Sequence, residues 1–256
     1  MPRSWHGPAY ATAGVAVILA TWYLVAELGF QTTGAVPGPL AVLGRLVGDV
    51  GEPRIWTAFA ATGREAALGY LGGNAVALLL AGVVVLVPWW EALAGQLAVI
   101  TSCIPLTAVA PLIVLLSGSG SRTAAVVLAG MSVFYTTVVG TLVGLRSADR
   151  TALDLVAVYG GGRWTALRKV RLATALPAVL SALRIGVPAA FVGAILGEFF
   201  LNGVDTGVGI ALQAAQIRFS PLPLWSLALL SAAVTGVAFG AATLVARAAA
   251  PWAQGQ

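Results

Sequence analysis

The feature that most constrains the fold is a series of long segments that carry almost no charge. A helix needs ~20 mostly apolar residues to cross the ~30 Å hydrocarbon core of a bilayer. Six runs of the chain are long and apolar enough, and Arg184 is the only charged residue in them. The runs are 4–26, 66–87, 92–121, 123–145, 172–197 and 219–246. We therefore predict six transmembrane helices, at about 9–28, 64–87, 92–116, 123–145, 173–197 and 222–246.

Composition agrees with a membrane protein. Apolar residues make up 59% of the chain and charged residues 9%, against roughly 45–50% and about 25% in soluble domains. So few charges cannot coat a water-soluble particle of this size. Uniform apolar runs also predict helices rather than the ~10-residue alternating segments of membrane strands. The expected fold is an all-α integral membrane protein with one transmembrane domain over residues 1–256. The first apolar run is longer than the 7–15 residues of a signal-peptide core, so we expect it to remain as a span.

Basic residues predict the orientation of these spans. With six spans and a cytoplasmic N-terminus, eight Lys and Arg residues fall inside, namely Arg3, the six in segment 146–171, and Arg247. Four fall outside, namely Arg45, Arg54, Arg122 and Arg218. Because cytoplasmic loops carry an excess of Lys and Arg, both termini are expected in the cytoplasm.

Segment 146–171 holds most of the excess charge. It contains six basic and two acidic residues, and so supplies four of the five net positive charges of the chain. We predict a helix over 151–159, a break at 160–162 because three consecutive glycines disfavour a helix, and a short helix over 163–170. Trp164, Leu167 and Val170 recur along one side of that short helix. From the residues alone, a loop that only fixes topology and an amphipathic helix that docks into a partner are equally expected.

The spacing within this segment matches a known signature. Asp154 is followed six residues later by Gly160, and the sequence Val-Arg-Leu-Ala begins ten residues after that glycine, at Val170. This resembles the cytoplasmic loop of permease subunits of binding-protein-dependent ABC importers, whose pattern is Glu-Ala-Ala, three residues, Gly, nine residues, and Ile-x-Leu-Pro. Here the acidic residue is Asp, the two alanines are replaced, and the final proline is Ala173.

Four further motifs resemble the nitrate, sulfonate, taurine and bicarbonate branch of this family, in consistent order along residues 35–215. They are Val36-Pro37-Gly38-Pro39 after the first span, Thr62-Gly63-Arg64 with Gly69, Ile104-Pro105 with Ala110-Pro111-Leu112, and Glu198 with Gly207-Val208-Gly209.

The resemblance implies a function, an architecture and a set of partners. It implies the permease subunit of an ATP-driven importer in the cell membrane of a prokaryote, with the type I architecture. A second copy of the chain, one cytoplasmic ATPase subunit per copy and an external solute-binding protein are the expected protein partners. The chain itself is expected to bind no cofactor and no nucleic acid, since ATP and Mg²⁺ belong to the ATPase. The residues expected to couple to the ATPase are Asp154, Gly160, Gly161, Arg163, Trp164, Leu167, Arg168 and Arg171.

Two charged residues near or in the fifth predicted span are candidates for the translocation path or its gate. Arg184 lies inside the span, where ionisable groups are costly and usually face a cavity or a partner. It either attracts an anion, or pairs as a structural residue with a carboxylate or backbone carbonyl, or lies near the cytoplasmic interface. Glu198 ends the same helix, as part of an external gate or binding-protein contact, or as a solvated helix end. Arg64 and Glu65 are expected to anchor the external start of the second span. Asn74 is expected to bond across helices.

Other functional classes are less consistent with the residues. An ion-coupled secondary transporter is the main alternative, but this class usually shows inverted repeats and buried carboxylates at mid-membrane. A membrane-embedded enzyme needs clustered catalytic groups. One His, one Cys and no acidic pair in the spans predict neither a catalytic nor a metal site. The chain also has no Gly-x-x-x-x-Gly-Lys-Ser/Thr phosphate loop. The expected cargo is a small solute, with a sulfonate, nitrate or related anion as the candidate.

Overall fold

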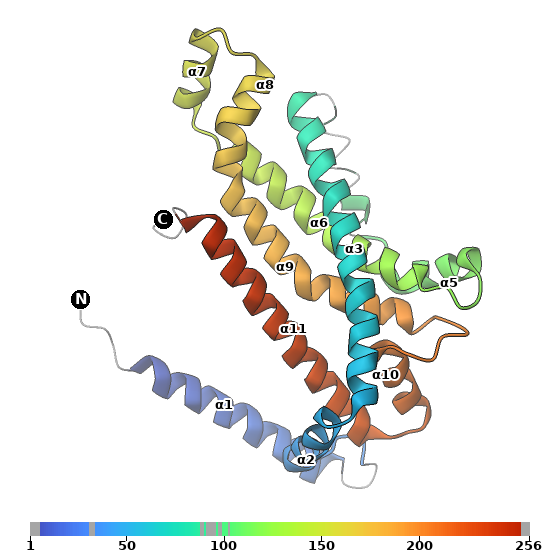
Figure 1. Cartoon of the computed structure of the whole chain (residues 1–256). Coiled ribbons are helices and arrows are strands. Elements are labelled where there is room, and N and C mark those ends of the chain that lie inside the picture. The colour runs from blue at the N-terminus through green and yellow to red at the C-terminus, as the bar shows by residue number, and fades with distance from the viewer. Residues whose placement is uncertain are drawn as a thin grey trace. The chain divides into compact units, whose positions relative to one another are not determined.

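The structure is a computed structural model that describes residues 6–30, 34–87, 90, 96, 99–101 and 103–251. Those residues form helices joined by short connections, with no strand among them (Figure 1). The helices are α1 (His6–Leu24), α2 (Pro39–Val50), α3 (Pro53–Leu86), α5 (Leu106–Ser117), α6 (Thr123–Arg146), α7 (Arg150–Val158), α8 (Arg163–Ala166), α9 (Leu172–Glu198), α10 (Val208–Ile217) and α11 (Pro221–Ala249). Two π-helical turns, η1 (Val25–Gly29) and η2 (Leu167–Arg171), continue α1 and precede α9.

Five helical segments of the described chain are long and apolar enough to cross a membrane, which confirms a multi-pass membrane protein. They are Thr12–Gly29, Pro53–Val84, Thr123–Arg146, Arg163–Glu198 and Pro221–Ala249. Most of the first half of the remaining predicted span, 92–116, lies outside the described residues, and its second half contains α5.

The second span differs from its prediction at its N-terminal end. α3 begins at Pro53 and runs for 34 residues, because proline suits the first turn of a helix and nothing in residues 54–63 stops one. Arg64 and Glu65 therefore lie about three turns inside α3, and the helix begins earlier than the predicted span. The connection predicted over 198–220 also contains a helix of its own, α10.

The described chain divides into two compact units. The first comprises Met1–Trp56 with Ala211–Ala232, and the second Thr57–Ile210 with Ala233–Gln256. In the first unit, the indole rings of Trp22 and Trp225 stack at 5.5 Å. Trp22 donates a hydrogen bond to the Pro37 carbonyl (3.1 Å), and Trp225 donates one to the Ala35 carbonyl (3.2 Å). These bonds hold the proline-containing connection that the sequence places after the first span.

The first unit also contains the short helix α2, which follows this connection. Asp49, near its end, is only 3% exposed. Its carboxylate pairs with Arg45 at 3.0 Å and accepts a hydrogen bond from the Ser226 hydroxyl at 2.7 Å. The opposite face of α2 exposes Leu40, Leu43 and Val47.

The second unit is built on close helix crossings. α6 runs beside α9 (Figure 1), and small residues allow the backbones to approach. A Cβ atom added at Gly73 of α3 would collide with the Gly130 backbone of α6, and one added at Gly197 of α9 would collide with the Ala125 backbone. Small residues at such crossings are typical of helices packed in lipid, where close contact supplies much of the attraction.

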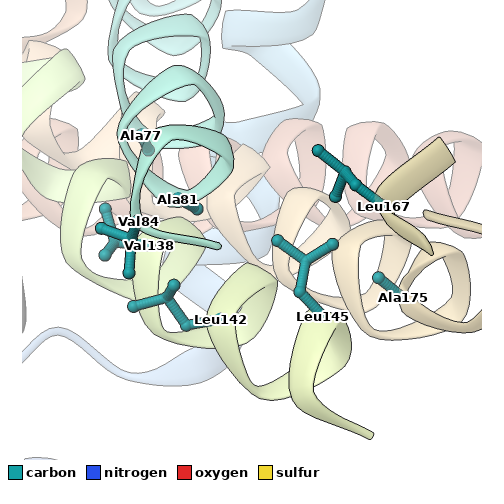
Figure 2. Close-up of a cluster of buried hydrophobic side chains, with 8 residues drawn as sticks. All are labelled: Ala77, Ala81, Val84, Val138, Leu142, Leu145, Leu167 and Ala175. Carbon is teal, nitrogen blue, oxygen red and sulfur yellow. The ribbon is translucent and has the colours of Figure 1, made fainter. Parts of the chain in front are cut away.

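One apolar cluster connects these crossings to the segment that precedes α9 (Figure 2). It joins residues of α3 and α6 to Leu167 of η2 and Ala175 of α9. The other members are Ala77, Ala81, Val84, Val138, Leu142 and Leu145. The short basic helix is therefore attached to the helix bundle through Leu167.

Candidate functional site

The first helix of segment 146–171, the predicted coupling segment, ends in a defined turn. Gly160 has φ +74°, a left-handed conformation that costs other residues ~1–2 kcal/mol. Its N–H donates to the Ala157 carbonyl (2.9 Å), and the Gly161 N–H donates to the Val156 carbonyl (2.8 Å). This is the Schellman arrangement that satisfies the last carbonyls of a helix. A Cβ atom at Gly161 would also meet Val156, so both glycines have a structural reason to be there.

The second helix of the segment does not end where the sequence predicts. The expected end at about Val170 is wrong, because α8 continues through η2 into α9, and Arg163–Glu198 forms one helical segment of 36 residues. At ~1.5 Å per residue it is about 54 Å long. The exposed first turn of this segment and a membrane-capable helix are therefore parts of one continuous element.

The apolar residues of the segment divide differently from the predicted stripe. Trp164 is 58% exposed, whereas Leu167 is 5% exposed and belongs to the cluster of Figure 2. Leu167 is thus placed to anchor the segment and not to contact a partner. The exposed apolar surface is extended instead by α7 and its cap, where Leu155, Val158 and Tyr159 are exposed. Val158 and Tyr159 follow Leu155 by three and four residues, a helical spacing in the sequence that would have indicated this exposed surface.

Charged side chains surround this exposed surface. Asp154, Arg163 and Arg168 are exposed and Arg171 is half-buried. Within the described chain, the ion pairs involve other residues, Arg45 with Asp49 and Arg122 with Glu65. The segment therefore presents aromatic and basic groups together, a composition typical of protein interfaces.

Glu198 lies at the other end of the same long helix and is fully buried. Its carboxylate accepts a hydrogen bond from the Thr62 hydroxyl (2.7 Å) and one from the Gly209 N–H (2.6 Å). The Thr62 oxygen in turn accepts from the Val208 N–H (2.9 Å). The interpretation of Glu198 as a solvated helix end is therefore wrong.

This arrangement explains the spacing between Glu198 and the Gly-Val-Gly sequence. The two acceptors satisfy the first N–H groups of α10, which no helical carbonyl can reach. A Cβ atom at Gly207 or Gly209 would collide with the Glu198 carboxylate. Glycine at these two positions allows the carboxylate to approach the backbone.

A second buried carboxylate lies nearby. Glu65, 2% exposed, forms an ion pair with Arg122, whose guanidinium also donates to the Thr206 carbonyl at 2.7 Å. The expectation that Glu65 is an interfacial anchor is wrong, because its carboxylate is buried within the second unit. Together the two carboxylates hold the connection between α9 and α10 against α3 and α6.

The prediction that Asn74 forms a hydrogen bond between helices is confirmed. Its amide Oδ1 accepts a hydrogen bond from the Thr137 hydroxyl at 2.6 Å, which joins α3 to α6, and its amide nitrogen donates to the Tyr70 carbonyl at 2.8 Å. Hydrogen bonds of this kind help hold helices together in lipid.

The two residues predicted for the translocation path do not form one site. Arg184 is half-buried on α9, about 21 Å along the axis from Glu198 at ~1.5 Å per residue. One of its terminal nitrogens donates to the Ser181 hydroxyl at 3.2 Å. Among the described residues, no group of three or more His, Cys, Asp or Glu side chains is placed to hold a metal ion.

The long apolar helices, the buried polar cluster around Glu198 and Glu65, and the exposed basic segment define a class, the multi-pass membrane proteins. The family described as "binding-protein-dependent transport system inner membrane component" matches residues 73–250. The chain belongs to this family of ABC transporter permeases.

Proteins similar to this chain agree with the family. The riboflavin transport system permease protein RibX of Chloroflexus aurantiacus is 30% identical over 84% of this chain and 80% of its own length. A probable ABC transporter permease of Haemophilus influenzae is 32% identical over 80% of this chain and 81% of its own length. The aliphatic sulfonates permease SsuC of Bacillus subtilis is 24% identical over 78% of this chain and 72% of its own length.

Proposed function

We propose that this chain forms, as a homodimer, the translocation path of an ATP-driven importer, and that segment 146–171 is its contact with the ATPase. The observation that carries the proposal is the continuity between this exposed segment and a membrane span, from Arg163 to Glu198. The chain lacks a phosphate loop, so ATP and Mg²⁺ belong to a separate ATPase subunit. An external binding protein delivers the solute.

The exposed groups of the segment have distinct roles in this proposal. Trp164 inserts into the ATPase surface together with the apolar side chains of α7, and Arg163 and Arg168 pair with acidic groups around them. Asp154 and Arg171 border the same surface. When ATP binding closes the two ATPases, α8 moves and the attached α9 moves with it. Leu167, just before α9, and Ala175, within α9, belong to one cluster with residues of α3 and α6, so the two helices move as one unit.

Arg184 and Glu198 act at different levels of the path. We assign Glu198 to the external gate through its bonds to Thr62 and Gly209, which determine whether α3, α9 and α10 stay together. Arg184 supplies positive charge in the inner half of α9. An ion-coupled secondary transporter remains less consistent, because the family is that of ABC transporter permeases.

For the solute we propose a small anion such as a sulfonate or nitrate. The relatives named for aliphatic sulfonates and taurine and the basic Arg184 support this choice. A riboflavin-like heterocycle is the second candidate, since RibX, at 30% identity, is more similar to this chain than SsuC.

Co-purification tests the docking role. In detergent, the wild-type chain co-expressed with its ATPase should elute with it in equal amounts. We expect Trp164→Asp to lose at least 90% of the bound ATPase, because truncating an aromatic interface anchor costs about 2 kcal/mol or more. Phe219→Asp is the matched control, since Phe219 is an exposed aromatic residue outside the segment. Full retention of the ATPase by Trp164→Asp would contradict the docking role.

A further inference from the structure

A hollow of about 450 Å³ lies between α9 and the C-terminal end of α11, within the second unit. Its polar lining consists of Arg184, Ser181 and Arg247. Pro177 and Leu180 contribute apolar walls, and none of the lining residues is acidic. Two permanently charged guanidinium groups therefore line one hollow, and no described residue of its lining supplies a carboxylate.

The hydrogen-bonding capacity of Arg184 is not used up. A guanidinium group carries five N–H donors. One terminal nitrogen reaches the Ser181 hydroxyl at 3.2 Å, and the buried Nε has no hydrogen-bond partner among the described residues. A buried charged donor without an acceptor costs more than a neutral one. The hollow thus provides donors and positive charge, and a bound oxyanion would supply the acceptors.

The position of the hollow along α9 and α11 indicates the source of such an oxyanion. Arg247 lies at the end of α11, which the distribution of basic residues places at the cytoplasmic surface. Arg184 lies about 21 Å from Glu198 along α9, which places it in the inner half of a ~30 Å hydrocarbon core. The hollow is therefore open to the headgroup level of the inner leaflet, where anionic lipids attract basic residues.

We propose that this hollow, the two-arginine pocket, binds a phosphate-type oxyanion between Arg184 and Arg247. Its volume lies within the 300–1,000 Å³ range of ligand pockets and exceeds what a single inorganic ion fills. The headgroup phosphate of an anionic phospholipid, with the start of an acyl chain against Pro177 and Leu180, therefore fits better than a free ion. The inference does not rest on the ATPase-docking proposal, and it would replace the role proposed above for Arg184 in the translocation path.

Native mass spectrometry of the full chain in neutral detergent tests the pocket. We would add phosphatidylglycerol, phosphatidylcholine or inorganic phosphate to the wild type and to Arg184→Gln and Arg247→Gln. Loss of one charge-assisted hydrogen-bonding group should weaken retention of phosphatidylglycerol roughly tenfold. Arg54→Gln is the control, because Arg54 is exposed and lies outside the second unit. It should retain the lipid like the wild type.

The outcomes separate the two sources of the oxyanion. Preferential retention of phosphatidylglycerol over phosphatidylcholine that is lost in both pocket variants, and that a roughly thousandfold excess of inorganic phosphate does not affect, identifies a lipid site. Binding of inorganic phosphate that displaces the lipid and is lost in the same variants identifies a site for free oxyanions. Equal lipid and phosphate binding by the wild type, both pocket variants and the control would overturn the proposal.

A second measurement covers variants that fail to fold. If the two-arginine pocket binds the headgroup, phosphatidylglycerol should raise the melting temperature of the wild-type chain relative to phosphatidylcholine, because a ligand of the folded state stabilises it. An identical melting temperature in the two lipids would count against the site without the use of any variant.

Discussion

At the residue scale, the most constrained position is Glu198. A single buried carboxylate accepts hydrogen bonds from the Thr62 hydroxyl and the Gly209 N–H. Its removal leaves the Gly209 N–H without an acceptor, whereas the Thr62 hydroxyl still has the Ala58 carbonyl at 3.2 Å. Each unsatisfied buried donor costs about 1–3 kcal/mol. Glycine at positions 207 and 209 provides no side chain that could accept the Gly209 hydrogen bond in its place.

Glu198→Ala should therefore lower the free energy of unfolding by about 1–3 kcal/mol. Glu198→Gln should cost less, because its amide oxygen still accepts one of the two hydrogen bonds. Thermal unfolding of the purified chain in detergent measures both. A melting temperature of Glu198→Ala equal to that of the wild type would show that these bonds contribute nothing to stability.

Gly160 and Gly162 provide a matched pair within the coupling segment. Gly160 has φ +74°, whereas Gly162 has φ −82° and no atom within 4 Å of an added Cβ. Gly160→Ala should destabilise the turn by ~1–2 kcal/mol, and Gly162→Ala should be close to neutral. Hydrogen exchange of the amides at 160 and 161 measures the difference. Equal exchange rates in the two variants would contradict the left-handed turn.

At the element scale, helix crossings depend on the face that each glycine occupies. Gly73 lies against the Gly130 backbone and the Val133 side chain, whereas its neighbour Gly72 has open space around it. Both stand in the same helix, so their helix propensities are equal and only their packing differs.

Gly73→Ala should destabilise the chain by about 1–3 kcal/mol, the usual cost of an overpacked contact. Gly72→Ala should be neutral or slightly stabilising, since alanine is the better helix former. Thermal unfolding of both variants measures this difference. If Gly72→Ala were the more damaging substitution, the α3–α6 crossing described above would be wrong.

The sequence predicts some elements well, for reasons that concern length and charge. Charge-free runs of 20 or more residues identify spans directly, and three glycines identify the break at 160–162. Element ends were predicted less well. Residues 54–63 and 167–171 contain both polar and apolar groups, and only their packing shows that the helices continue through them.

The sequence predicts the residue types of the candidate site better than it predicts their arrangement in space. Spacing located Asp154, Gly160 and Trp164, and a resemblance located Glu198. Helical periodicity placed Leu167 on the same side as Trp164, but Leu167 is buried against α3 and α6. The pairing of Glu65 with Arg122 joins residues far apart in the chain, which no local pattern reveals.

At the scale of the whole molecule, the excess positive charge and the buried carboxylates lie at opposite ends of one long helix. Almost all of the excess positive charge lies in segment 146–171, where the exposed aromatic and basic side chains also gather. The buried carboxylates lie at the opposite end of the long helix from Arg163 to Glu198. One continuous helix thus connects the proposed ATPase contact to the proposed external gate.

Transport by proteoliposomes tests this account most directly. The chain, its ATPase and its binding protein would be reconstituted, and uptake of taurine, nitrate and riboflavin measured with ionophores present to abolish ion gradients. We predict accumulation of one of these solutes that requires ATP, the ATPase and the binding protein, and that falls at least tenfold in Trp164→Asp, consistent with the ~2 kcal/mol value of an interface anchor. Uptake driven by an ion gradient in liposomes that contain this chain alone would contradict the account.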